Sequence, residues 1–218
     1  MSTENVAHHH EEGAVLLEQN GPIAMITLSR PAALNAMTWT MYQQLEAHLV
    51  SLAAGDTTRA IIIHGEGKAF AAGTDIQQFQ GFSGEDGIAY EHKMEAIVER
   101  LYTISKPKHL VDSFGSMRTK EMLFTGRLLT ATDAVQCGFL TAITDEERLI
   151  THVTGVAQQI SSLAPLTIWS VKEAQARLNA AEKAIDYDDV LARIYGSSDF
   201  AEGVQAYLEK RKPDWRGQ

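Results

Sequence analysis

The sequence has little of what disulfides, membrane spans or nucleic-acid binding require. Cys137 is the only cysteine among 218 residues, so no disulfide can form within the chain, and we expect a reducing compartment such as the cytoplasm. No apolar run approaches the roughly 18 residues that a membrane-spanning helix needs. Acidic residues outnumber basic ones by 28 to 19, which argues against non-specific binding to nucleic acid or to an anionic membrane surface.

The first 13 residues also lack a hydrophobic signal core, so secretion is not expected. Three consecutive histidines in this segment could contact a metal, although a mobile polar tail is the commoner outcome for such a sequence. The rest of the chain has enough apolar residues for one sizeable core, since 44% of all residues are hydrophobic. The sequence contains no internal repeat of fixed period.

The first third of the chain predicts the order strand, strand, helix, strand. Residues 14–19 and 23–28 are rich in β-forming residues and flank Asn20-Gly21, which is the strongest short hairpin signal. Residues 60–65, AIIIHG, predict a short strand that is buried on both faces.

The helix between these strands has clear boundaries. Thr38 is a suitable N-cap and Gly55 a suitable stop. Its apolar positions have helical spacing and are Met41, Leu45, Leu49 and Leu52.

Helical patterns dominate the remainder. Residues 85–104 predict a helix on which Glu91, Glu95 and Glu99 share one face, and a solvated face is favoured over an acid/base role for them. Thr130 and Asp133 predict a capping box. The following FLTAI, residues 139–143, predicts a short strand.

From Asp145 the pattern stays helical to the end, with breaks near Pro165 and Gly196. We expect the last helix to stop at Pro213, with Lys210, Arg211 and Lys212 in its last turn, where cations suit the helix dipole.

One loop invites a functional interpretation: HGEGKAFAAGTDIQQF, residues 64–79. It is not a P-loop, because Ile62 and Ala69 stand where that motif needs glycine and a hydroxyl, and Phe70 breaks the dinucleotide fingerprint. The small residues before Thr74 would let a ligand approach the backbone, and N–H groups at a helix start can stabilise an oxyanion. On spacing alone, a plain strand-to-helix turn without a ligand is the commoner outcome.

Residues 67–76, GKAFAAGTDI, resemble the signature loop of the crotonase family, the enoyl-CoA hydratases and isomerases. Residues 28–37, LSRPAALNAM, resemble its R-P-x-x-x-N-A segment. Residues 123–143 resemble its T-G-x-x-x-x-A-x-x-A-x-x-x-G-L segment, and residues 197–215 its C-terminal helix with a basic cluster. The four motifs occur in the family's order and together cover most of the chain.

The resemblance implies an α/β fold. A crotonase-like spiral of β-β-α units would occupy residues 14–144, and a helical region that makes trimer contacts, often within hexamers, would occupy residues 145–218. The ligand would be an acyl-CoA or enoyl-CoA thioester, with coenzyme A as part of the substrate, no separate cofactor and no metal. The backbone N–H of Thr74 would be one oxyanion donor.

The resemblance also implies a set of contacts to coenzyme A. These positions are Ala33, Leu34, Lys68, Ala72, Gly73, Asp75, Ile76, Lys210 and Lys212. Ala33 and Leu34 would lie along the pantetheine arm, and Ala72 would line the adenine pocket. The lysines would lie near the phosphates, those at 210 and 212 from a neighbouring subunit, although ordinary surface charge explains these lysines equally well.

The sequence departs from the family after Lys106-Pro107. Family members continue there with an apolar strand, a G-G-G turn that supplies the second oxyanion donor, and a block that bears the acid and base glutamates. This chain contains no G-G-G, and Pro107 is followed at once by sequence that resembles the family beyond that block. Losing one donor of an oxyanion hole costs about 2.7–4 kcal/mol of barrier.

Two explanations stay open. The chain is an enzyme of this family from which a segment is missing, which the abrupt join favours, or a shortened relative that binds CoA thioesters or assembles oligomers without catalysis. Replacement acids or bases are not favoured among Glu85, Asp86, Glu91, His109 and Asp112. Cys137 has no neighbouring His or Lys in the sequence that would activate it as a nucleophile.

Overall fold

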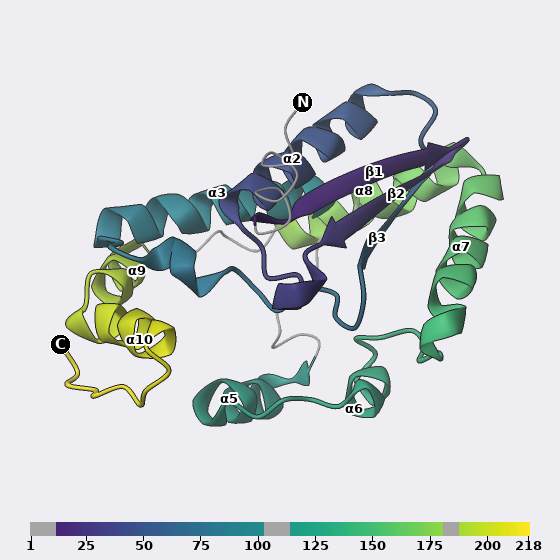
Figure 1. The fold of residues 1–218 in the computed structure, drawn as a ribbon. Helices are drawn as coiled ribbons and strands as arrows, with labels where there is room; N and C mark the ends of the chain where they lie inside the picture. Colours follow the sequence, from purple (N-terminus) through teal and green to yellow (C-terminus); the bar gives the residue numbers. More distant parts are fainter. Residues whose placement is uncertain (1–11, 103–113, 181–187) are drawn as a thin grey trace, which may run out of the picture.

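The computed structural model describes residues 12–102, 114–180 and 188–218 (Figure 1). Its strands are β1 (Ala14–Asn20), β2 (Ile23–Ser29) and β3 (Ala60–Gly65). Its helices are α2 (Trp39–Ala54), α3 (Gly84–Tyr102), α5 (Ser116–Thr125), α6 (Ala131–Gln136), α7 (Glu146–Ser162), α8 (Pro165–Ala180), α9 (Asp188–Tyr195) and α10 (Ser198–Leu208), with 3-10 turns η1 (Pro31–Ala33) and η2 (Ile76–Phe79). Most of the N-terminal tail and the join at residues 107–108 lie outside the described residues.

The sheet has the order β1-β2-β3. β1 and β2 pair antiparallel, with Asn20 opposite Ile23, so the hairpin prediction is confirmed. Gly21 has a φ of +60°, which glycine adopts without the strain that a side chain would add. β3 lies parallel to β2, which places the crossover helix α2 between them in sequence. Mixed strand pairing with packed helices confirms the α/β class.

The core lies between this sheet and α2. Thr38 caps α2 by accepting a hydrogen bond from the N–H of Met41, and Gly55 follows the last residue of the helix, as predicted. The predicted apolar stripe is buried, together with Ala24, Ile26 and Leu28 of β2. Each fully buried Leu or Met contributes about 1.5–3 kcal/mol relative to an exposed one.

β3 is less buried than its sequence predicted. Only Ile62 is buried, with 7% of its surface exposed, whereas its neighbours keep intermediate exposure. The physical reason is position: β3 is the last strand of the described sheet, so no further strand of that part covers its outer edge. α7 contacts both β3 and β2, and it thereby brings the C-terminal region against the sheet.

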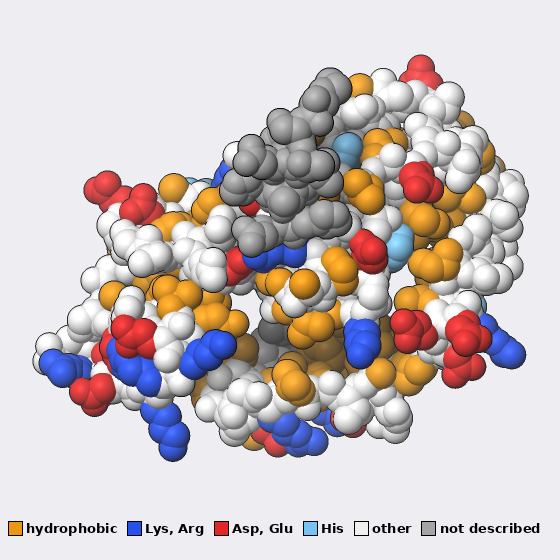
Figure 2. Space-filling model, in the orientation of Figure 1, with side chains coloured by type: hydrophobic (Ala, Val, Ile, Leu, Met, Phe, Trp, Pro, Cys, Tyr) orange, Lys and Arg blue, Asp and Glu red, His pale blue; other side chains and the backbone are white. Residues whose placement is uncertain are grey.

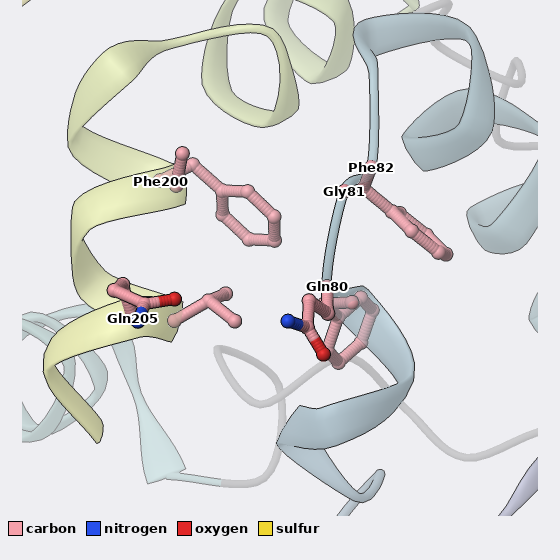
Figure 3. Close-up of a pocket in the computed structure, with 8 residues that line it drawn as sticks. Gln80, Gly81, Phe82, Phe200 and Gln205 are labelled. Carbon is pink, nitrogen blue, oxygen red and sulfur yellow. The ribbon is translucent and has the colours of Figure 1, made fainter. Parts of the chain in front are cut away.

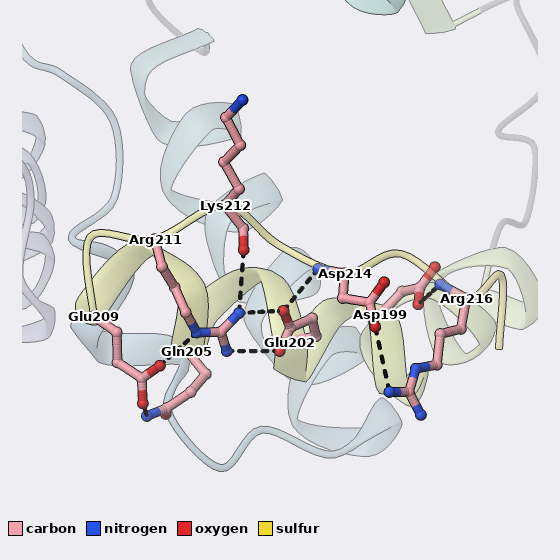
Figure 4. A network of polar contacts seen from close by, with 8 residues as sticks. All are labelled: Asp199, Glu202, Gln205, Glu209, Arg211, Lys212, Asp214 and Arg216. Carbon is pink, nitrogen blue, oxygen red and sulfur yellow. Dashed lines mark hydrogen bonds and ion pairs between the residues drawn. The ribbon is translucent and has the colours of Figure 1, made fainter.

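Two C-terminal predictions are wrong. Residues 139–143 form no strand, because the described sheet offers them no neighbour to pair with, and Phe139 and Ile143 are half exposed. α10 ends at Leu208, before the basic cluster, and Lys210 has a φ of +53°. The chain reverses there because Arg211 folds back onto Glu202 (Figure 4).

α5 and the segment that follows it carry a large uncovered apolar surface. Thr119 is the one buried side chain of α5, and its hydroxyl has no hydrogen-bond partner among the described residues. Apolar side chains surround the hollow between α5, α6 and the rest of the molecule (Figure 2). The most exposed apolar side chains of α5 and of the segment after it are Met117, Leu123, Phe124 and Leu128, at 66–88%. Such a surface is typical of an element whose packing partner is absent.

Candidate functional site

Two sequence motifs, residues 28–37 and 67–76, form one short ladder. The N–H of Met37 donates to the carbonyl of Gly73 at 2.8 Å, and the N–H of Asp75 donates to the carbonyl of Met37 at 2.9 Å. The N–H of Ala72 donates to the carbonyl of Leu34 at 3.0 Å. The loop at Thr74 is therefore held against residues 34–37 by backbone bonds on both sides of Thr74.

Asn35 fixes the start of this loop. Its side chain is completely buried; its Oδ1 accepts from the N–H of Arg30 at 2.8 Å. Its Nδ2 donates to the carbonyls of Glu66 and Ala69 at 2.8 and 2.7 Å. Asn35 also has a φ of +56°, a conformation that Asn tolerates better than most residues. The R-P-x-x-x-N-A motif contained this residue, but its structural role was not predicted.

Arg30 and Asp75 form an ion pair below the loop. Their side chains are 15% and 14% exposed, and Nη1 lies 2.7 Å from Oδ2. The other carboxylate oxygen of Asp75 accepts from the N–H of Gln77 at 3.0 Å and caps η2. Both oxygens of the side chain thus serve the loop itself.

Thr74 lies at the centre of this arrangement. No hydrogen bond of the described residues uses its backbone N–H, although Gly73 and Asp75 on either side are paired. Gly73 and Ala72 are exposed, and a Cβ added to Gly73 would meet nothing within 4 Å. The loop therefore combines a backbone donor that has no described partner with open space at the neighbouring Gly73.

The other predicted contacts fall into two groups. Ala33 and Leu34 lie beside the loop, and Leu34 is 52% exposed, so both are accessible to the same ligand. Lys68 is exposed on the segment that leads into the loop. Lys210 and Lys212 follow α10, and no described hydrogen bond joins them to the Thr74 loop.

An apolar groove lies near the predicted contact Ile76. The groove has a volume of about 670 Å³, includes Ile76 in its lining, and runs between η2, α9, α10 and the C-terminal segment. Its walls include Ile76, Phe79, Phe200, Val204 and Trp215. A smaller pocket of about 140 Å³ shares Phe79, Phe200 and Val204 with it and lies between α10 and the segment that follows η2 (Figure 3).

An aromatic cluster near Thr74 was not predicted. It joins Trp39 and Tyr42 of α2 to Phe79, Phe82 and Tyr90, and continues to Tyr195 and Phe200. Ring centroids lie 4.8–6.4 Å apart, the range in which aromatic pairs attract. The signal was spread over residues 39–200, so sequence spacing gave no indication of it.

The acidic residues beyond the loop have structural contacts. Asp86 accepts hydrogen bonds from the backbone N–H and hydroxyl of Ser83, and these hold the pKa of its carboxyl below the ordinary value. Glu91 accepts from the hydroxyl of Tyr195 at 2.6 Å, and burial together with this carboxylate raises the pKa of Tyr195. Both carboxylates therefore serve local structure.

Cys137 has a cationic neighbour that the sequence did not reveal, because Arg118 of α5 contacts its sulfur. His109 and Asp112 lie outside the described residues. In the parts of the chain that are described, no group of three or more His, Cys, Asp or Glu side chains could hold a metal ion. No described helix is long and apolar enough to cross a membrane.

Comparisons with known proteins agree with the motifs. Two family models described as enoyl-CoA hydratase/isomerase match residues 23–111 and residues 107–218, and the second alone spans more than half of the chain. The chain belongs to the enoyl-CoA hydratase/isomerase family. The two matches meet at residues 107–111, where the sequence pattern placed the join.

Individual relatives support the same assignment. A probable enoyl-CoA hydratase of Rhizobium meliloti is 26% identical over 250 residues, covering 93% of this chain and 97% of the relative. The 1,2-epoxyphenylacetyl-CoA isomerase of Escherichia coli is 24% identical over 268 residues, covering 98% and 99%. Because the first alignment is longer than the 218 residues of this chain, the relative contains several tens of residues that have no counterpart here.

Solved structures confirm the crotonase fold. A methylmalonyl-CoA decarboxylase in complex with 2-nitronate-propionyl-CoA has a TM-score of 0.77 and 23% identity, covering 94% of this chain and 98% of that one. An enoyl-CoA hydratase/carnithine racemase from Magnetospirillum magneticum has a TM-score of 0.67 and 23% identity, covering 94% and 96%. Members that catalyse different reactions share the fold, so family membership does not determine the reaction.

Proposed function

We propose that this chain binds acyl-CoA thioesters at the Thr74 loop, with the thioester carbonyl accepting a hydrogen bond from the backbone N–H of Thr74. The observation that carries the proposal is this N–H, which has no partner among the described hydrogen bonds although the ladder fixes its neighbours on both sides. A donor held in place before the ligand arrives needs no reorganisation when charge develops on the carbonyl oxygen.

The surroundings of Thr74 suit the rest of such a ligand. Ala72 and Gly73 leave the outer face of the loop free of side chains, so the thioester can reach the backbone. Ala33 and Leu34 would contact the pantetheine arm, with Lys68 near a phosphate. The acyl chain would extend past Ile76 into the groove of about 670 Å³, whose walls are largely apolar. The relative solved with a CoA ligand supports this ligand class.

The reaction, if the chain catalyses one, would be of the hydratase or isomerase type, through a thioester enolate. The alternative function is binding of CoA thioesters, or assembly of oligomers, without turnover. Two observations favour it: a relative contains several tens of residues that this chain lacks, and this chain has no G-G-G turn of the kind that supplies the family's second donor. A missing general base alone costs roughly 10²–10⁴-fold in rate.

The decisive experiment compares acetoacetyl-CoA with free coenzyme A by calorimetry and assays hydration of crotonyl-CoA in parallel. We expect the thioester to bind more tightly than free coenzyme A, because only the thioester reaches Thr74. Turnover would exclude the non-catalytic alternative, and binding without turnover would support it. Equal affinity for the two ligands would contradict the proposed contact, and no binding of either would contradict the proposal as a whole.

A trimer or hexamer, formed through residues 145–218, is part of the same proposal, with Lys210 and Lys212 reaching a neighbour's ligand. Sedimentation of the intact chain tests it. A purely monomeric protein at high concentration would leave these two lysines without the role proposed for them.

A further inference from the structure

Thr74 carries a second polar group beside its N–H. Its side-chain oxygen Oγ1 lies 2.7 Å from the hydroxyl of Tyr42 and 2.8 Å from the hydroxyl of Tyr90. Tyr42 belongs to α2 and Tyr90 to α3, so three separate segments meet at this one oxygen. We call these residues the hydroxyl triad.

The protons of the triad can be counted. Three hydroxyls carry three protons, whereas the two contacts use only two. If the tyrosines and Thr74 donate in sequence, the last tyrosine keeps its proton. If both tyrosines donate to Thr74, Thr74 keeps its own proton. In either of these arrangements one hydroxyl proton remains for an acceptor outside the triad.

The surroundings of Tyr90 favour its protonated form. Tyr90 is half-buried beside the rings of Trp39 and Phe79, at centroid distances of 5.3 and 5.1 Å. Burial raises the pKa of the Tyr90 phenol, so it holds its proton at neutral pH. Hydrogen bonds between neutral groups in such an apolar setting are stronger than in water.

We infer that Tyr42 and Tyr90 both donate to Thr74, so that Thr74 presents two donors, its N–H and its Oγ1–H, to the same thioester oxygen. The inference rests on the proposed function and deepens it. A threonine oxygen can accept two hydrogen bonds and donate one, so this arrangement uses its full capacity. The N–H and the hydroxyl of one residue are close enough to converge on one acceptor.

This arrangement would replace the second oxyanion donor that the chain lacks. The Gly-rich turn that supplies it in the family does not occur in this chain, and Thr74 would restore the number of donors from a single residue. Thr74 would then be the residue that touches the substrate. Tyr42 and Tyr90 would be positioning residues, which act only by orienting the Thr74 hydroxyl.

The test uses cinnamoyl-CoA, whose long-wavelength absorption shifts to the red when its carbonyl is polarised. Thr74→Val keeps the branched shape and the N–H but removes the hydroxyl, whereas Thr74→Ser keeps the hydroxyl. We expect Thr74→Val to bind about 5- to 10-fold more weakly and to lose most of the red shift, since one hydrogen bond is worth about 1 kcal/mol. Thr74→Ser should retain both.

The tyrosines are tested with Tyr42→Phe and Tyr90→Phe, which keep the rings and their packing. Each should reduce the red shift while the far-ultraviolet circular dichroism stays unchanged. An undiminished red shift in Thr74→Val, or in both tyrosine variants, would overturn the inference while leaving thioester binding intact. Failure of the unaltered chain to bind cinnamoyl-CoA would overturn the proposed function and this inference together.

Discussion

Replacement of Asn35 tests whether a single buried amide shapes the Thr74 loop. Asn35→Gly removes three hydrogen bonds of 2.7–2.8 Å and leaves the N–H of Arg30 and two carbonyls without their partner. At about 0.5–1.5 kcal/mol for each bond, the free energy of unfolding should fall by about 2–4 kcal/mol. Because glycine adopts a φ of +56° without strain, this variant isolates the hydrogen bonds.

Two further variants separate the contributions. Asn35→Ala should cost about 1–2 kcal/mol more than Asn35→Gly, because a Cβ in the left-handed region is strained. Gln19→Ala is the matched control, since its amide also makes three hydrogen bonds but is exposed. We expect it to stay within about 0.5 kcal/mol of the unaltered chain.

The assay is urea unfolding followed by tryptophan fluorescence, together with acetoacetyl-CoA binding in the absence of urea. Asn35→Gly should lose both stability and affinity, because the loop that presents Thr74 begins at the carbonyls that Asn35 holds. The reasoning is refuted if Asn35→Gly is as stable as Gln19→Ala and binds the thioester with unchanged affinity.

Three other predictions concern the scaffold. Gly65→Ala should displace the backbone at Ala69, because the added Cβ would lie 2.1 Å from the carbonyl oxygen of Ala69. Thermal unfolding should show that the free energy of unfolding falls by at least about 3 kcal/mol, and an unchanged stability would contradict the close approach. Thr38→Ala should cost about 1 kcal/mol in the same measurement, since it removes the N-cap of α2, and Thr38→Ser should recover most of it. Hydrogen bonds from Arg211 and from the N–H of Asp214 lower the pKa of Glu202 to about 2, so this contact stabilises the folded tail fully above pH 4.5 and is lost as the pH falls toward 2. The environment of Trp215, followed by NMR, should change over that pH range, and an identical pH profile in Arg211→Ala would disprove the link.

The sequence predicted those features that depend on neighbours along the chain. The hairpin at Asn20-Gly21, the cap at Thr38 and the capping box at Thr130 are confirmed, since each is decided within a few residues. The family motifs also brought residues 33–34 and 72–75 to one place, as the ladder at Thr74 requires.

Features that depend on distant partners were missed or wrong. Residues 139–143 have strand-forming side chains, but the described sheet offers them no partner. The hydroxyl triad and the contact of Arg118 with Cys137 join segments that no local pattern connects. The reversal after α10 depends on Glu202 capturing Arg211, which overrides the preference of basic residues for a helical last turn.

The Thr74 amide itself provides the most direct test of the central claim. Its ¹H and ¹⁵N resonances can be followed while acetoacetyl-CoA is added, with free coenzyme A as the reference ligand. A thioester carbonyl that accepts this N–H should move the amide proton downfield in a saturable way, and free coenzyme A should not. A Thr74 amide that stays unchanged while acetoacetyl-CoA saturates the protein would contradict the account.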